Sequence, residues 1–120
     1  MNHEDLDAWK FAIDLAASVY KVTRSFPDDE KYGLVSQMRR AVVSIPSNIA
    51  EGAARSGSKE FLQFLAIAAG SASELSTQLI IAGRIGLGNQ DELAGLRQEL
   101  TRISMLLQGL MRSIKAKETK

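Results

Sequence analysis

The sequence predicts an all-α protein, a single domain of four antiparallel helices in up-down-up-down order. Three observations predict this class. Apolar residues recur at steps of three and four along most of the chain, and no segment alternates as a strand does. Apolar residues make up 45% and charged residues 24% of the chain, the balance of an ordinary globular protein. Finally, 120 residues suffice for one core but not for two, so residues 1–120 are expected to form one domain.

The first helix is expected over residues 4–25. Five of its residues share one stripe at steps of three and four: Leu6, Trp9, Ile13, Ala16 and Tyr20. A second apolar stripe lies beside the first, which predicts packing on more than one side. Pro27 ends the helix, because the residue before a proline is pushed out of the helical region.

The second helix is expected over residues 28–54, with Asp28 or Asp29 capping its free amides. Pro46 interrupts the pattern and predicts a kink, because it removes an amide donor and crowds the preceding turn. Ser47 and Asn48 are expected to satisfy backbone groups freed by the kink. Glu51 and Arg55 stand four apart in the favourable order, so an ion pair is expected at the helix end.

The third and fourth helices are expected over residues 58–85 and 90–117. Ser58 is a suitable N-cap for the third helix, and Gly86 followed by Leu87 is typical of a left-handed helix stop. Asn89 and Glu92 resemble a capping box at the start of the fourth helix. Because all three connections are short, successive helices are expected to pack antiparallel.

Two helices carry too few charges for a solvated face. Between Glu60 and Arg84 the only formal charge is Glu74, and residues 41–50 carry none. A monomeric bundle normally exposes a charged face on every helix, so we predict a homo-oligomer. The candidate interface residues are Ala41, Ile45, Ile49, Ala66, Ala69, Gly70, Ser73 and Glu74. Membrane insertion is the competing reading, and the polar residues of the third helix argue against it.

The residues of common active sites are missing. His3 is the only histidine and there is no cysteine, so the sequence predicts no catalytic residue, metal or cofactor. A site built from carboxylates alone, using Glu51, Glu74 or Asp14, is the enzymatic alternative. A cysteine-free chain suits the reducing cytoplasm, and the acidic N-terminal segment lacks the pattern of a secretory signal, so a cytoplasmic location is expected.

Nucleic-acid binding requires local clusters of basic residues, because fifteen basic and fourteen acidic residues leave a net charge of only +1. One candidate cluster surrounds the turn between the second and third helices: Arg39, Arg40, Arg55 and Lys59. The other lies at the C-terminal end: Arg112, Lys115, Lys117 and Lys120. The structural alternative is that an arginine pairs with Glu51 or Glu74. Tyr32 is available to stack on bases, whereas Trp9 and Tyr20 are expected to pack in the core.

Four motifs carry a resemblance to a known bacterial family. They are D-L-x-x-W-K at residues 5–10, F-P-x-x-E-x-Y-G-L at 26–34, Q-M-R-R-A-x-x-S-I-P-S-N-I-A-E-G at 37–52 and F-L-x-I-A-x-G-S-A-x-E-L at 64–75. The sequence resembles the four-helix-bundle proteins called 23S ribosomal RNA intervening-sequence proteins. Their relatives include the accessory variability determinant of diversity-generating retroelements.

The resemblance implies a four-helix subunit assembled into a ring, typically a pentamer. In the retroelement relatives, it further implies binding of nucleic acid and of a partner reverse transcriptase. We therefore expect a non-catalytic homo-oligomeric scaffold that binds RNA or DNA and a protein partner such as a reverse transcriptase. The alternative is a protein-only interaction module that binds no nucleic acid.

Overall fold

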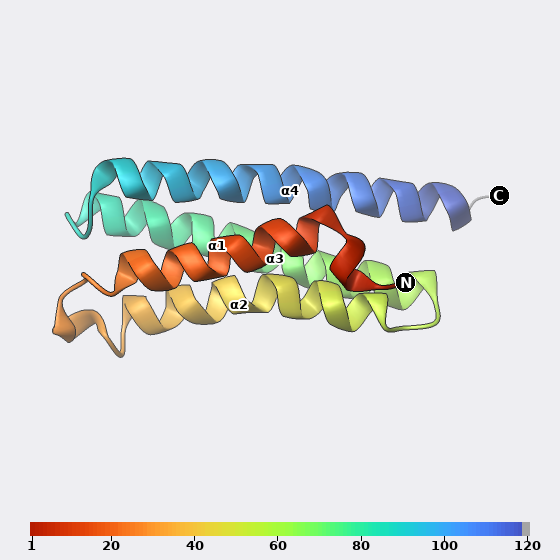
Figure 1. Cartoon of the computed structure of the whole chain (residues 1–120), viewed down its shortest axis with the longest axis horizontal. Helices are drawn as coiled ribbons and strands as arrows, with labels where there is room; N and C mark the ends of the chain where they lie inside the picture. Colours follow the sequence, from red (N-terminus) through yellow and green to blue (C-terminus); the bar gives the residue numbers. More distant parts are fainter. Residues whose placement is uncertain (119–120) are drawn as a thin grey trace.

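The structure is a computed structural model that describes residues 1–118 and measures 51 × 22 × 20 Å. Its four long helices lie along the longest axis (Figure 1): α1 (Asp7–Thr23), α2 (Leu34–Ala53), α3 (Ser58–Arg84) and α4 (Gln90–Glu118). Two short 3-10 helices, η1 (His3–Asp5) and η2 (Asp28–Glu30), precede α1 and α2. There is no strand in residues 1–118, so the prediction of an all-α fold with four helices is confirmed.

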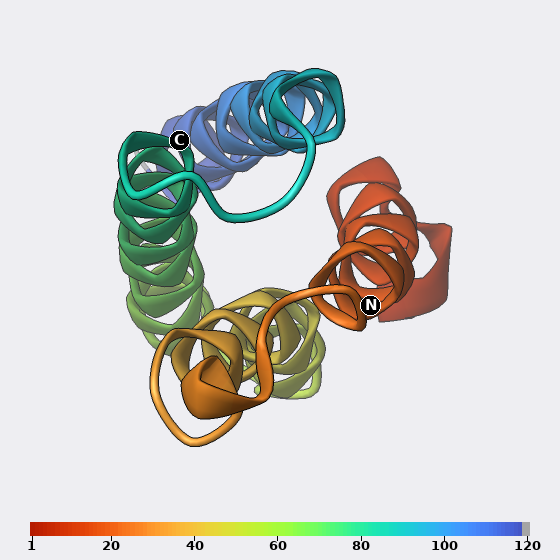
Figure 2. The same ribbon diagram turned by 90° about the vertical axis from the view of Figure 1, so that its left-hand side faces the viewer.

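Viewed end-on, the helices occupy the corners of a quadrilateral in chain order (Figure 2). Each helix contacts the next, and α4 also contacts α1, whereas the diagonal pairs α1–α3 and α2–α4 make no comparable contact within residues 1–118. In Figure 1 the chain runs from right to left along α1 and α3 and from left to right along α2 and α4. The pairing of α2 with α3 is the most extensive.

Each helix contributes one apolar stripe to a single core. The fully buried large side chains come from all four helices: Leu15, Val19, Met38, Val42, Ile45, Ile49, Leu65, Leu75, Leu79, Ile103 and Leu107. Their spacing of three and four residues places them on one side of each helix. Burying each such side chain contributes about 1.5–3 kcal/mol, so this shared core is the main source of stability.

The connection between α3 and α4 follows the sequence prediction closely. Gly86 has φ +79°, and the Leu87 amide donates to the Ala82 carbonyl at 2.9 Å, which completes the predicted left-handed stop. The Asn89 side-chain oxygen accepts hydrogen bonds from the amides of Asp91 (2.8 Å) and Glu92 (3.1 Å). The predicted cap of the fourth helix is therefore confirmed.

The starts of the first three helices differ from the predictions. Residues Asp28–Glu30 form η2, and α2 begins only at Leu34, because Gly33 lies outside the helical region at φ −104°, ψ −110°. Leu6 is extended, which separates η1 from α1. Ser58 is the first residue of α3 and not its N-cap. The N-cap is Gly57, so no side chain caps this helix. By contrast, α2 continues through the buried Pro46 to Ala53.

Small and polar residues bring α2 and α3 close together. A Cβ atom added to Gly52 would lie 2.8 Å from Phe64 Cβ and 2.9 Å from Phe61 Cδ1, so only glycine fits there. Further along, the hydroxyls of Ser44 and Ser71 are 2.8 Å apart. Asn48 Nδ2 donates to the Ser44 carbonyl at 2.8 Å, whereas the carbonyl that Pro46 leaves without its amide donor is that of Val42.

One polar side chain in this pair of helices is incompletely satisfied. Gln78 is 5% exposed, and its Nε2 donates to Glu74 Oε1 at 3.1 Å. Its Oε1 atom is buried and has no hydrogen-bond partner within the described residues. An unpaired buried oxygen costs free energy, so α3 is not optimised for the stability of the chain alone.

Candidate functional site

Arg39 joins α2 to the C-terminal end of α1. Its Nε donates to Thr23 Oγ1 at 3.0 Å, and one terminal nitrogen donates to the Tyr20 carbonyl at 3.3 Å. The guanidinium carbon lies 4.5 Å from the centre of the Tyr20 ring, a cation–π contact. These contacts hold the planar group in one orientation, so Arg39 is bound by α1 and not by Glu51 or Glu74.

A surface groove of about 480 Å³ surrounds this arginine. Eight residues from α1, the connection after it and α2 line the groove: Tyr20, Lys31, Tyr32, Val35, Ser36, Arg39, Arg40 and Val43. Three of them are cationic and none is acidic. We call this surface the tyrosine groove. Lys31 Nζ lies 5.6 Å from the centre of the Tyr32 ring, and Tyr32 is 88% exposed.

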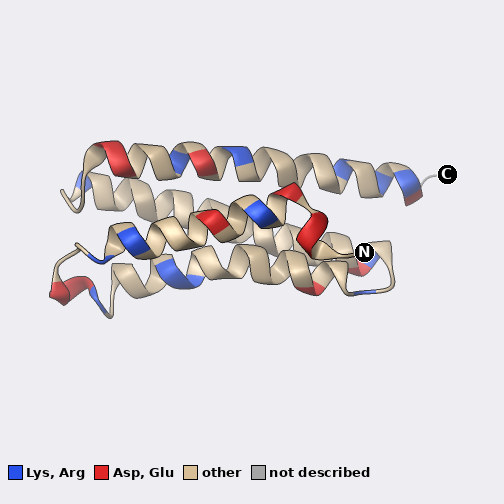
Figure 3. Cartoon of the chain, in the orientation of Figure 1, with Lys and Arg blue, Asp and Glu red and all other residues tan. Residues whose placement is uncertain are grey.

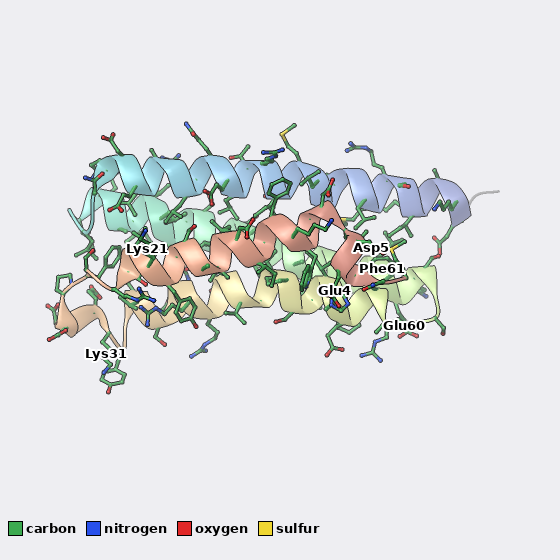
Figure 4. All side chains as sticks on the ribbon, viewed as in Figure 1. Glu4, Asp5, Lys21, Lys31, Glu60 and Phe61 are labelled. Atoms are coloured by element: carbon green, nitrogen blue, oxygen red, sulfur yellow. The ribbon has the colours of Figure 1, made fainter. Side chains whose placement is uncertain are left out.

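Further basic residues lie next to the tyrosine groove. A smaller groove shares Lys31, Val35 and Arg39 with it and adds Arg24 and Asp28. Figure 4 places Lys21 on α1 and Lys31 on the connection after it, at the same end of the bundle. The sequence does not predict a site at Lys21, Arg24 or Lys31, because the three residues do not form a basic run and Lys31 lies in a segment with helix-start residues. Its packing beside α2 is a tertiary effect with no local signal.

In the structure, the four basic residues predicted to surround the turn between α2 and α3 do not lie together. Arg39 and Arg40 lie near the start of α2, whereas Arg55 and Lys59 flank its other end, roughly 20 Å away along a helix that rises 1.5 Å per residue. Arg55 donates to Glu51 Oε2 at 3.3 Å, as predicted, and its guanidinium covers the Phe64 ring at 4.9 Å. The four residues therefore do not form one site.

A second basic region lies at the opposite end of the bundle. Figure 3 shows basic segments at the C-terminal end of α4 and at the turn between α2 and α3, together with acidic segments of the N-terminal region. The predicted residues Arg112, Lys115 and Lys117 are exposed on α4, and Lys59 is exposed at the start of α3. Lys120 lies outside the described residues. Acidic residues are interspersed at this end, as they are beside the tyrosine groove, where η2 consists of Asp28, Asp29 and Glu30.

The prediction of an interface position is wrong for three residues of α2. Ala41, Ile45 and Ile49 of α2 are at most 4% exposed, because they pack in the core of the same chain. The apolar spacing identified the correct stripe of α2 but could not show whether this stripe faces another helix of the chain or a second copy. These residues are unavailable for an interface between copies.

The predicted interface residues of α3 lie on its surface. Ala66, Gly70, Ser73 and Glu74 are exposed, and Ala69 is partly buried against the core. Large apolar side chains accompany them, since Ile67, Ile81 and Ile85 are 52%, 44% and 57% exposed. We call eight exposed residues of α3 and its C-cap the α3 face: Ala66, Ile67, Gly70, Ser73, Glu74, Thr77, Ile81 and Ile85. Other residues of α3 are exposed as well, among them Lys59, Glu60, Gln63, Ile80 and Arg84.

The carboxylates proposed for an enzymatic alternative lie apart. Asp14, Glu51 and Glu74 are all exposed and belong to α1, α2 and α3, respectively. No group of three or more potential metal-binding side chains occurs in residues 1–118. His3, in η1, packs edge-on against Trp9 with ring centres 5.1 Å apart.

By length and composition alone, α3 resembles a membrane-crossing helix, and 33% of its apolar window is buried in this fold. Core helices of soluble proteins pass the same test.

The fold and these surfaces define a helical-bundle protein whose distinctive features are a basic groove and a helix face with exposed apolar side chains and one carboxylate, Glu74. The model of the family described as 23S rRNA-intervening sequence protein matches residues 4–109, and the chain belongs to this family. The resemblance noted in the sequence is thereby confirmed.

A solved structure shares the fold. It is the crystal structure of a protein with unknown function from the S23 ribosomal protein family of Bacteroides thetaiotaomicron, with a TM-score of 0.78 and 20% sequence identity. The match covers 87% of this chain and 97% of the other. At this identity the likeness shows the fold alone. No curated protein matches this chain.

Proposed function

We propose that the protein is a non-catalytic, homo-oligomeric scaffold of the cytoplasm that binds RNA or DNA. In this proposal, up-down-up-down bundles associate into a ring, and the resemblance to the family favours a pentamer. The observation that carries the proposal is the α3 face, which exposes large apolar side chains and very little charge. A protein partner such as a reverse transcriptase belongs to the same proposal and is supported by the resemblance to the retroelement relatives.

The α3 face supports self-association because solvent-exposed helix surfaces are normally charged. Between Glu60 and Arg84 this helix has one formal charge, whereas α4 exposes Arg97, Glu99 and Arg102 within two turns. Ile67, Ile81 and Ile85 are half exposed, so a second copy would remove their remaining apolar surface from water. Ala66 and Gly70 lack large side chains and would allow that copy to approach closely.

A pair of matched variants tests this interface. Ile81→Asp places a charge on the α3 face, and Ile13→Asp places the same charge on α1 at a site of similar exposure (44% and 42%). Because both side chains are partly exposed, neither change alone should unfold the chain. We expect Ile81→Asp to lower the mass of the assembly in sedimentation experiments and Ile13→Asp to leave it unchanged. Equal masses for both variants and the unmodified protein would contradict the proposed interface.

The tyrosine groove supports the nucleic-acid part of the proposal. Lys31, Arg39 and Arg40 line it without an acidic residue. A single groove of this size provides a weak positive field, but repetition in a ring multiplies the number of simultaneous contacts. The proposal predicts binding of RNA or DNA that weakens steeply with added salt.

The protein-only interaction module is the second candidate, and the net charge of +1 favours it. It predicts no change in the migration of labelled RNA or DNA at low salt. It also predicts that the tagged protein recovers one protein and no nucleic acid from its host. Binding that disappears with added salt would exclude this candidate.

A further inference from the structure

We propose that the tyrosine groove binds unpaired nucleotides, so that the preferred ligand of the protein is single-stranded RNA or DNA and not a duplex. Bases stack on Tyr32 and on the paired Tyr20 and Arg39, while Lys31 and Arg40 contact phosphates. This inference rests on the proposed nucleic-acid binding and specifies its ligand.

The charge of the groove fits a polyanion. Three of its eight lining residues are cationic and none is acidic, although the chain as a whole is nearly neutral. The smaller groove continues from it through Lys31 and Arg39 to Arg24, with Asp28 as its one acidic lining residue. The two grooves together form a continuous basic path across the end of α1, the connection after it and the first half of α2. A flexible backbone of phosphates can follow such a path.

Tyr20 and Arg39 provide one flat surface at the wall of the groove. The guanidinium carbon of Arg39 lies 4.5 Å from the centre of the Tyr20 ring, and two hydrogen bonds to Thr23 Oγ1 and the Tyr20 carbonyl fix the orientation of the arginine. These bonds use only part of the five N–H donors of the guanidinium. Fixed aromatic and arginine planes are the surfaces on which proteins stack unpaired bases.

Tyr32 provides the second flat surface. It is 88% exposed and belongs to the connection between η2 and α2, beside Lys31. A large aromatic side chain in this position contributes little to the core, so the fold does not account for it. Stacking on a base would bury the ring and place the Lys31 ammonium near the adjoining phosphate.

The combination of stacking and charge favours single strands. In a duplex each base is stacked between its neighbours and paired at its edge, so tyrosine side chains reach only phosphates and groove edges. In a single strand the faces of the bases are free, and stacking on aromatic side chains is tolerant of sequence. Phosphate contacts alone would serve duplex and single strand alike.

Fluorescence anisotropy of the full-length assembled protein tests the inference. The probes are a labelled uridine oligonucleotide, the DNA strand of matching length and a duplex of that length, all at low salt. We expect the single strands to bind more tightly than the duplex. Tyr32→Ala should weaken single-strand binding by roughly 5- to 150-fold, the loss expected for one stacked base, with little change for the duplex. Tyr32→Phe keeps the ring and should retain binding.

Arg40→Gln provides a separate measure of the phosphate contacts. Arg40 is exposed, so its replacement should leave the fold intact. We expect weaker binding to single strand and duplex alike, and a decrease of about one in the slope of log affinity against log salt. The circular dichroism spectrum and mass of each variant are compared with those of the unmodified protein to exclude misfolding.

The binding results distinguish a failure of single-strand stacking in the tyrosine groove from a failure of nucleic-acid binding as a whole. If neither single strand nor duplex binds at low salt, both are overturned. If duplex and single strand bind equally and Tyr32→Ala binds normally, nucleic-acid binding stands and the stacking groove is wrong. If Tyr32→Phe loses as much affinity as Tyr32→Ala, the hydroxyl group and not the ring makes the contact, which also overturns the inference.

Discussion

Replacing Gly52 by alanine tests how closely α2 and α3 approach each other. The new Cβ atom would lie 2.8 Å from Phe64 Cβ, 2.9 Å from Phe61 Cδ1 and 3.3 Å from the Phe61 carbonyl oxygen. Favourable contacts between carbon atoms lie near 3.5–4.0 Å, roughly 1 Å farther apart. Phe64 Cβ is attached directly to the backbone of α3, so a side-chain rotation cannot relieve the contact. The two helices must separate near their connecting turn.

Two opposing effects determine how much Gly52→Ala changes the free energy of unfolding. Overpacking of this kind costs about 1–3 kcal/mol. Alanine in place of glycine in a helix stabilises by up to about 1 kcal/mol, and less near a helix end such as this one. We therefore expect Gly52→Ala to lower the free energy of unfolding by about 1–2 kcal/mol. The steric effect outweighs the gain in helix propensity.

Gly95 in α4 supplies the control, because a Cβ atom added there meets no atom within 4 Å. Gly95→Ala should raise the free energy of unfolding by up to about 1 kcal/mol from helix propensity alone. Both variants are unfolded with urea, monitored by far-UV circular dichroism and compared at one protomer concentration, since association affects apparent stability. If Gly52→Ala is stabilised as much as Gly95→Ala, the close approach of α2 and α3 is refuted.

Three further substitutions test local features by the same urea measurement. Gly86→Ala should destabilise by about 1–2 kcal/mol, because φ is +79° at this position; an unchanged midpoint would argue against the left-handed stop. Asn89→Ala should cost about 1 kcal/mol by removing the cap of α4, whereas Asn89→Ser should retain most of the stability. Gln78→Met should stabilise by about 1 kcal/mol, because it removes the unpaired Oε1; a loss of stability would mean that this oxygen has a partner in the assembly.

The number and type of the helices could be predicted from the sequence because the signals are local. A stripe such as Leu93, Leu96 and Leu100 repeats at helical spacing, and Gly86 and Asn89 act on their own backbone or on the next few residues. These features depend on neighbours within one or two helical turns, so no knowledge of the tertiary structure was required.

The predictions that failed have two causes, one in the local backbone and one in the packing of the helices. Asp28 and Asp29 suit a helix start, but the backbone of Gly33 is not helical, so α2 begins only at Leu34. Ile45 and Ile49 are buried against other helices of the same chain. Apolar spacing alone cannot show whether such a stripe packs against the same chain or against a second copy.

The candidate site was only partly predictable for the same reason. Arg39 and Arg40 were identified, but Lys31 and Tyr32 join them only after the connection folds beside α2. The separation of Arg40 from Arg55 is predictable, because the thirteen helical steps from Arg40 to Ala53 extend the chain by roughly 20 Å.

In the proposed assembly the α3 face is covered by a second copy of the chain. Sedimentation equilibrium of the unmodified protein at micromolar concentration measures this association. We expect a mass that is a multiple of 13.1 kDa, with five copies as the favoured ring. A stable species of 13.1 kDa across that concentration range would contradict self-association and leave the exposed apolar side chains of the α3 face without an explanation.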